Sequence, residues 1–195
     1  MIKLPRLRKS AAYSITEPIV RLLARTNITP SILTWLGFAI TIGAAVLIST
    51  GWLLIAGIVV LVAGFFDMLD GALARYTNQV TRYGAFLDST LDRVSEAVLL
   101  LGVLIWYVFQ PYAIGILLVA VAFISSQLVS YIRARAEALG LECQIGLFTR
   151  PERVIVLAIG LLIGQVAIAL GIVILFSFVA MGQRTLHVWK QIKAG

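Results

Sequence analysis

The sequence predicts an all-α integral membrane protein with about six transmembrane helices and an amphipathic interfacial helix ahead of them. Hydrophobic residues make up 61% of the 195-residue chain. The mean hydropathy is +1.00, which is not typical of a soluble globular domain. Lysine and arginine are absent from residues 26–74, 94–132 and 154–183. Each interval is about long enough for two apolar spans, so three helical hairpins are expected.

The basic residues gather between these intervals, which places every basic cluster on the same side of the bilayer. The positive-inside rule makes that side cytoplasmic, with both termini there, in a multi-pass protein of the plasma membrane. The net charge of +7 would suggest a nucleic-acid partner in a soluble protein. Here the charge follows the membrane topology, so membrane lipids are the expected partner and nucleic acid is not.

Residues 1–30 are expected to form a cytoplasmic juxtamembrane segment, and residues 31–195 the membrane domain. Basic and aliphatic residues alternate in the first segment, which predicts an amphipathic helix from about Ala11 to Arg25 in the interface. Its role is either attraction to anionic headgroups or simple anchoring of the topology. Residues 27–30, Asn-Ile-Thr-Pro, predict a turn before the first span.

The first two hairpins follow directly from the apolar pattern. The first is predicted at residues 31–50 and 53–76, with Gly51 and the interfacial Trp52 forming its outer turn. The second is predicted at residues 83–109 and 112–139. The segment from Tyr76 to Arg82, which joins the two hairpins, is predicted to be a cytoplasmic loop.

The third hairpin is short. Residues 154–183 would form about 45 Å of helix, less than two full crossings of a roughly 30 Å hydrocarbon core. We therefore expect a fifth span that starts at Pro151 and a sixth from about Gln165 to Gln191, with charged ends drawn into the membrane. Arg153 and Arg184 would then lie in a cavity and not in bulk solvent.

Four aspartates interrupt the apolar pattern: Asp67, Asp70, Asp88 and Asp92. A carboxylate at membrane depth costs roughly 2.5–3.5 kcal/mol on insertion scales, so four together require a physical reason. The members of each pair share a helical face, and carboxylates this close require a counter-cation. Oxygen ligands of this kind favour Mg²⁺ or Mn²⁺, with two ions expected. The alternative is an acid-lined cavity without catalysis.

Small residues accompany the acids. Gly71 and Gly84 expose backbone, and Arg75 can pair with phosphate, a combination that suits a diphosphate. The complete pattern from Asp67 to Asp92 is D-x2-D-G-x2-A-R-x8-G-x3-D-x3-D. Its fixed letters at fixed spacing are far more specific than a lone glycine motif.

This pattern resembles the signature of the CDP-alcohol phosphatidyltransferases and matches it at every fixed position. Those membrane enzymes move a phosphatidyl group from a CDP-linked lipid to a second alcohol and release CMP. The resemblance implies that Asp67, Asp70 and Asp88 bind metal, and that Asp92 binds metal or acts as the catalytic base. It also implies a homodimer, and a CDP site formed by Pro30, Gly71, Ala74, Arg75, Gly84 and Asp88.

Four arginines from three predicted helices lie at the cytoplasmic end, where guanidinium groups can bind phosphate. They form either a pocket for a phosphorylated acceptor or an ordinary positive-inside belt. The surrounding segments resemble the acceptor pocket of actinobacterial members of the family that use inositol 1-phosphate. The resemblance implies CDP-diacylglycerol and inositol 1-phosphate as substrates, with the acceptor held by Ser130, Arg133, Arg135, Arg153 and Arg184. Arg133 stands where those members carry lysine, which keeps the charge but changes the geometry.

Other readings of the sequence stay open. The acceptor could be glycerol 3-phosphate, with phosphatidylglycerol phosphate as product, and the donor could carry an archaeal ether lipid. A divalent-cation transporter is the alternative from another class, because intramembrane carboxylates also mark ion paths. A transporter needs acids that are reachable from both sides, whereas every aspartate of the pattern is predicted near one face.

Overall fold

The computed structural model describes residues 17–110, 112–143, 145, 146 and 148–194. No β-strand occurs within these ranges, so the all-α prediction is confirmed. The main helices are α2 (Pro30–Ser49), α3 (Leu53–Tyr76), α4 (Arg82–Val108), α5 (Ala113–Ala138), α6 (Arg150–Leu162) and α7 (Val166–Ala194). Their bounds agree with the predicted spans to within about one turn of helix.

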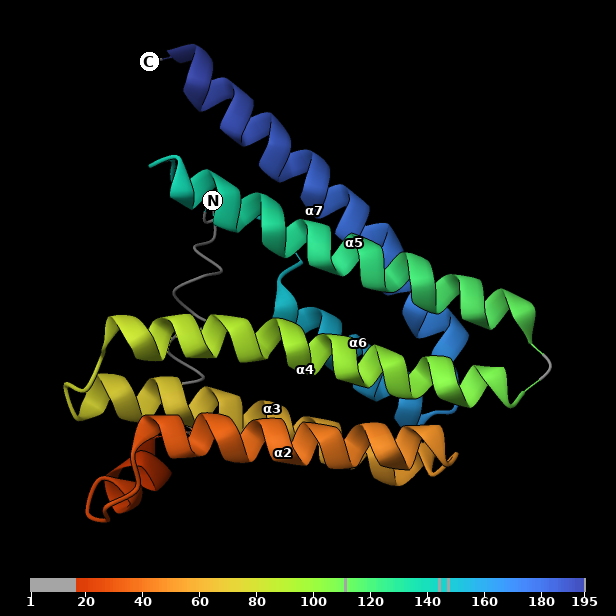
Figure 1. The fold of residues 1–195 in the computed structure, drawn as a ribbon, viewed down its shortest axis with the longest axis horizontal. Coiled ribbons are helices and arrows are strands. Elements are labelled where there is room, and N and C mark those ends of the chain that lie inside the picture. The colour runs from red at the N-terminus through yellow and green to blue at the C-terminus, as the bar shows by residue number, and fades with distance from the viewer. Residues whose placement is uncertain (1–16, 111, 144, 147, 195) are drawn as a thin grey trace.

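The six helices lie side by side (Figure 1), and their contacts close a ring. Helix α2 contacts α3 and α4, α3 contacts α6, α6 contacts α7, α7 contacts α5, and α5 contacts α4. The connections from α2 to α3, from α4 to α5 and from α6 to α7 lie at one end of the ring, and the α3–α4 turn lies at the other. This is the arrangement of three hairpins that the basic-free intervals predict.

Four of the described helices are long and apolar enough to cross a membrane: α2, α3, α5 and α7. Helix α4 has 27 residues but carries two arginines, two aspartates and a glutamate between Arg82 and Glu96. Helix α6 has 13 residues, and a helix of that length spans roughly 20 Å. A multi-pass membrane protein follows from these helices, and six crossings stay a prediction.

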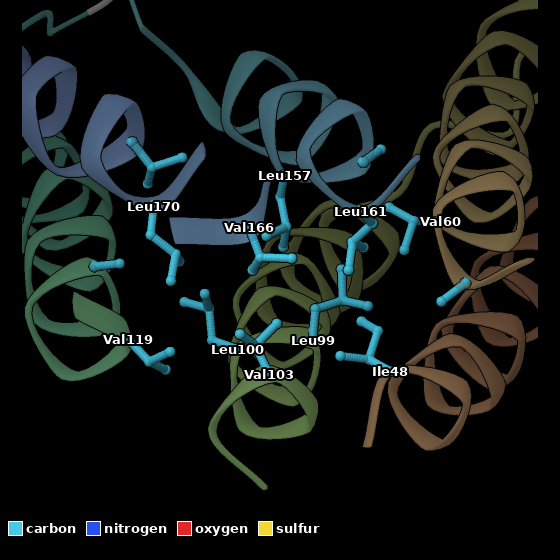
Figure 2. Close-up of a cluster of buried hydrophobic side chains, with 14 of the residues drawn as sticks. Ile48, Val60, Leu99, Leu100, Val103, Val119, Leu157, Leu161, Val166 and Leu170 are labelled. Atoms are coloured by element: carbon cyan, nitrogen blue, oxygen red, sulfur yellow. The ribbon is translucent and has the colours of Figure 1, made fainter. Parts of the chain in front are cut away.

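Aliphatic side chains from every helix of the ring fill its centre (Figure 2). Each of the labelled residues is at most 5% exposed: Ile48, Val60, Leu99, Leu100, Val103, Val119, Leu157, Leu161, Val166 and Leu170. Two glycines bring backbones together around this core. A Cβ atom on Gly57 would lie 2.8 Å from Cγ of Leu162, and one on Gly102 would lie 2.6 Å from the Ala45 carbonyl oxygen. The residue type at these positions therefore sets how closely α3 approaches α6 and α4 approaches α2.

Residues 17–23 form a short helix that packs against the ends of α2 and α3. Val20 is buried in a cluster with Leu33, Leu69 and Leu73, whereas Arg21 is exposed and pairs with Glu17. The part of the predicted amphipathic helix that precedes residue 17 lies outside the described residues. The described part therefore has one face on the protein and one face outward, close to the end of the ring that carries the aspartates.

Candidate active site

Three side-chain caps fix where the site-bearing helices begin. The Thr29 hydroxyl accepts a hydrogen bond from the amide of Ile32 at the start of α2. The Thr81 hydroxyl accepts one from the amide of Gly84, at 2.9 Å, at the start of α4. At the start of α6 the Thr149 amide donates to the Glu152 carboxylate at 2.8 Å. Such caps satisfy the free amides of a first helical turn, and here they set the positions of the residues that follow.

Three of the four predicted aspartates meet between α3 and α4. A carboxylate oxygen of each of Asp67, Asp70 and Asp88 lies within 4.8 Å of those of the other two. Asp70 is 4% exposed, and its Oδ2 atom is buried without a hydrogen-bond partner. Unpaired buried carboxylate oxygens are unfavourable, and three converging carboxylates form the oxygen set that hard divalent ions prefer. The residues present therefore fit a divalent metal ion.

The predicted nucleotide residues line one cavity of about 610 Å³ beside these carboxylates. All six of them take part: Pro30, Gly71, Ala74, Arg75, Gly84 and Asp88. The Arg75 guanidinium folds back over Gly71, where an added Cβ would lie 3.3 Å from Nη1. The absence of a side chain on Gly71 thus leaves room for the guanidinium next to the helix backbone, on the wall of the cavity.

A second cavity, of about 260 Å³, is lined by Asp67. Aliphatic and aromatic side chains of α2, α3, α4 and α6 form most of its wall, among them Phe38, Leu61 and Val154. Thr34 lines both cavities. Most residues that line the first cavity are polar or charged, among them Asp70, Arg75 and Gln79, and we call it the polar cavity. The second is lined mostly by apolar residues and is called the apolar cavity, so the pair suits a ligand with a polar head and an apolar tail.

Asp92, the fourth aspartate of the pattern, is bound by Arg150, an arginine that lies outside the sequence pattern. Asp92 Oδ1 forms a short hydrogen bond with Nη1 of Arg150, and the same Nη1 lies 2.8 Å from Oδ2 of Asp67. Asp92 is not part of the group formed by the other three, because it lies one turn further along α4. Arg150 thus joins the start of α6 to one acid on each of α3 and α4.

A second arginine of α6 is bound by a second acid of α4. Arg153 Nε lies 2.6 Å from Oε1 of Glu96, and Nη2 lies 2.8 Å from Oε2. Arg153 is 3% exposed and Glu96 is 5% exposed. The burial of Arg153 agrees with the expectation from the short third hairpin. Its ion pair with Glu96 was not predicted.

Arg184 is buried on α7, again as the short hairpin predicts. Its guanidinium donates to two backbone carbonyls, from Nη1 to Val129 at 2.5 Å and from Nε to Ile145 at 3.0 Å. It therefore ties α5 and the α5–α6 connection to α7.

The other predicted acceptor residues lie further along α5. Ser130 is half-buried, Arg135 is exposed, and the exposed Arg133 pairs with Glu137 at 2.8 Å. None of the five predicted acceptor residues lines either of the two cavities described above. The described structure therefore brings the metal and nucleotide residues together, and leaves the acceptor residues as a separate group toward α5 and α7.

The two residues missed from the sequence, Arg150 and Glu96, had a weak signal. Asp92 and Glu96 are four residues apart, and Arg150 and Arg153 are three apart, so each pair lies on one helical face. Matching acidic and basic faces favour docking of two helices. Sequence alone did not show that α4 and α6 are neighbours, so the two pairs were not matched.

A ring of membrane helices with carboxylates between a polar and an apolar cavity defines a membrane enzyme that acts on a lipid with a polar headgroup. The sequence model of the CDP-alcohol phosphatidyltransferase family matches residues 27–188. The chain belongs to this family and is a CDP-alcohol phosphatidyltransferase.

Individual relatives are known by sequence and by structure. The phosphatidylinositol phosphate synthase of Mycobacterium tuberculosis is 42% identical over 165 residues, which cover 82% of this chain and 75% of that protein. The archaetidylinositol phosphate synthase of Methanothermobacter thermautotrophicus is 33% identical over 188 residues, covering 91% and 94%.

Two crystal structures of the M. tuberculosis phosphatidylinositol phosphate synthase are similar in fold. The structure with bound CDP-DAG has a TM-score of 0.82 and 35% identity, and covers 90% of this chain and 94% of that one. The structure in complex with manganese and citrate has a TM-score of 0.82 and 34% identity, and covers 89% and 88%.

Proposed function

We propose that the protein transfers the phosphatidyl group of CDP-diacylglycerol to inositol 1-phosphate and releases phosphatidylinositol phosphate and CMP. The observation that carries this proposal is the polar cavity, which places all six predicted nucleotide residues beside three converging aspartates. The identity of 42% to a phosphatidylinositol phosphate synthase supports the choice of acceptor.

The two cavities accommodate the two ends of the donor. The cytidine and diphosphate occupy the polar cavity, where Gly71 and Gly84 leave the backbone accessible and Arg75 pairs with a phosphate oxygen. The start of the diacylglycerol portion lies in the apolar cavity, which Asp67 lines. The relative crystallised with CDP-DAG shares this fold, which supports the same placement here.

Asp67, Asp70 and Asp88 would hold a divalent ion. Asp92 would either bind a second ion or lie at the edge of the same site. The ion is Mg²⁺ or Mn²⁺, and a related structure contains manganese. When bound, it supplies positive charge that offsets the charge of the diphosphate. Oδ2 of Asp70, a buried carboxylate oxygen without a hydrogen-bond partner, would be satisfied by such an ion.

Asp92 takes the proton from the acceptor hydroxyl, whose oxygen then attacks the phosphorus on the lipid side. The bond from that phosphorus to the oxygen of CMP breaks, and Arg75 stabilises the charge that develops on the departing phosphate.

The acceptor phosphate binds to Ser130, Arg133, Arg135, Arg153 and Arg184. Glu96 occupies Nε and Nη2 of Arg153, so the phosphate would meet that guanidinium at Nη1. Arg184 uses Nε and Nη1 for backbone carbonyls, so its Nη2 serves the phosphate. Both arginines are thereby oriented before the acceptor arrives, which lowers the entropy lost on binding.

In the membrane, we place six helices across the bilayer, with the aspartates and both termini on the cytoplasmic side of the plasma membrane. The shared end of the three hairpin connections supports this orientation (Figure 1). A water-soluble nucleotide product also requires access to the cytoplasm. A homodimer is the assembly that the family resemblance suggests.

One observation favours a variant of the donor. The archaeal relative is an archaetidylinositol phosphate synthase, so a CDP-linked ether lipid is the second candidate donor for the same reaction.

Release of CMP from the purified protein tests these assignments. CDP-diacylglycerol and Mg²⁺ are supplied with inositol 1-phosphate, inositol or glycerol 3-phosphate, and the first combination should release CMP fastest. Preference for glycerol 3-phosphate would replace the proposed acceptor. Repetition with a CDP-linked ether lipid separates the two donors. Metal flux into liposomes without CMP release would instead support a transporter.

A further inference from the structure

Contacts with residues of three helices fix the position of Arg150. It is the first residue of α6, whose start is held by the contacts between Thr149 and Glu152. From there its Nη1 reaches Asp67 on α3 and Asp92 on α4. The side chains of all three residues are less than a third exposed. One permanently charged guanidinium is therefore shared by two carboxylates from two other helices.

Asp67 belongs to two groups at once. One of its oxygens binds Arg150, and the residue also contributes to the cluster with Asp70 and Asp88. An oxygen that accepts a hydrogen bond from a guanidinium is a poorer ligand for a metal ion, because its lone pairs are occupied and two cations close together repel. Arg150 therefore places a positive charge against carboxylates that would also bind a divalent ion.

The pairing of Arg150 leaves one of its own groups unsatisfied. Its Nε atom is buried and has no hydrogen-bond partner, whereas Arg153, one turn further on, uses both Nε and Nη2 on a single carboxylate. A buried donor without a partner is unfavourable. The hydrogen bonds of Arg150 to the two aspartates thus come from one nitrogen, Nη1, whereas Arg153 is held through two.

We propose that Arg150 is an internal counter-cation that competes with a divalent ion for Asp67 and Asp92. Without the ion, Arg150 neutralises both acids and holds α6 against α3 and α4. When the ion binds, the guanidinium gives up at least one of these carboxylates. This inference rests on the metal site of the proposed function and makes Arg150 a positioning residue for that site.

The competing explanation is that Arg150 only staples α6 to its neighbours, in which case its loss would lower stability and leave the metal affinity unchanged.

Binding of Mn²⁺ to the full-length protein in detergent, followed by electron paramagnetic resonance, separates the two explanations. Under the proposal, Arg150→Gln binds Mn²⁺ about tenfold more tightly than the unsubstituted protein, since a competing unit charge near the ion is gone. Arg150→Lys keeps the charge, so its affinity stays within about threefold of the original. Arg153→Gln is the matched control, because it removes another arginine of α6, one whose partner is Glu96 and not an aspartate of the cluster. Its Mn²⁺ affinity should not rise.

Each outcome decides the question. Unchanged or weaker Mn²⁺ binding in Arg150→Gln, or equal tightening in Arg153→Gln, would overturn the competition. Absence of Mn²⁺ binding in the unsubstituted protein would overturn the proposed metal site along with it.

Arg150→Gln is purified with Mn²⁺ present, because the loaded site does not need the guanidinium, and the affinity is read as the ion is removed stepwise. Failure to recover folded protein even with Mn²⁺ would show that Arg150 is required to hold α6 against α3 and α4, and would also overturn the proposal.

Discussion

The guanidinium of Arg153 is bound by both carboxylate oxygens of Glu96 inside the helix ring, at 2.6 and 2.8 Å. Arg150 meets Asp92 one turn earlier on both helices. Two basic residues on one face of α6 therefore pair in register with two acidic residues on one face of α4. These two ion pairs hold the start of α6 against the acidic residues of α4.

Glu96→Gln should weaken acceptor binding and stability together. Loss of one partner of a buried ion pair typically costs about 3–5 kcal/mol, and without Glu96 the Arg153 guanidinium is no longer oriented. We expect a lower midpoint of thermal unfolding and a KM for inositol 1-phosphate that rises more than the KM for CDP-diacylglycerol. Glu17→Gln is the control, because the exposed pair of Glu17 with Arg21 lies outside the proposed site and contributes about 0–1 kcal/mol. Equal effects of Glu96→Gln on both KM values would make the pair purely structural.

Asp92→Asn should remove the base while leaving the donor site intact. General-base catalysis typically contributes about 10²–10⁴-fold, so the rate of CMP release should fall by at least that lower factor. Binding of CDP-diacylglycerol, measured by the shift in unfolding temperature that it produces, should change little, because Asp92 does not line the polar cavity. Turnover at the original rate would exclude Asp92 from proton transfer.

Gly71→Ala should impair the donor site. The added methyl group would lie 3.3 Å from Nη1 of Arg75, and would push the guanidinium away from the wall of the cavity. A hydrogen bond to a charged group contributes about 1.5–3 kcal/mol, so the KM for CDP-diacylglycerol should rise about ten- to a hundredfold. Gly43→Ala is the matched control, since an added Cβ there has nothing within 4 Å and Gly43 lines neither cavity. An equal rise in both variants would contradict the placement of the nucleotide.

Removal of divalent ions should lower both activity and stability. An ion that binds only the folded state adds about 2.7 kcal/mol at a hundred times its Kd, so Mn²⁺ should raise the unfolding temperature of the metal-free protein. Asp70→Asn should abolish most of this increase, because Asp70 supplies the buried oxygen without a partner. Glu17→Gln, which alters an exposed pair with Arg21, should keep it. A Mn²⁺ effect that survives in Asp70→Asn would place the ion elsewhere.

Prediction from sequence succeeded where the arrangement of side chains depends on one segment of the chain alone. The spacing of Asp67 and Asp70, and that of Asp88 and Asp92, put each pair on one helical face whatever the rest of the chain does. Three of these acids do meet in the structure. The thirty-residue interval before Arg184 likewise predicted that Arg153 and Arg184 are buried, because a helix hairpin that short draws its charged ends inward.

The family resemblance implies that Arg153 and Arg184 bind the acceptor phosphate, but the sequence does not identify what holds them. The structure shows Glu96 on one and two backbone carbonyls on the other. Those partners lie 57, 39 and 55 residues away along the chain. No periodicity in a single segment carries information about contacts at that separation.

The sequence by itself determined the apolar hairpins, the common side of the basic clusters and the grouping of acids on helical faces, because hydropathy and helical periodicity are local properties. Only the tertiary structure decided that α6 lies between α3 and α7, and therefore that Arg150 reaches Asp67 and Asp92, 83 and 58 residues away. Helices that are apolar on most sides can pack in several orders in a membrane. The order is selected by close backbone contacts, such as those at Gly57 and Gly102, and by the pairing of buried charges.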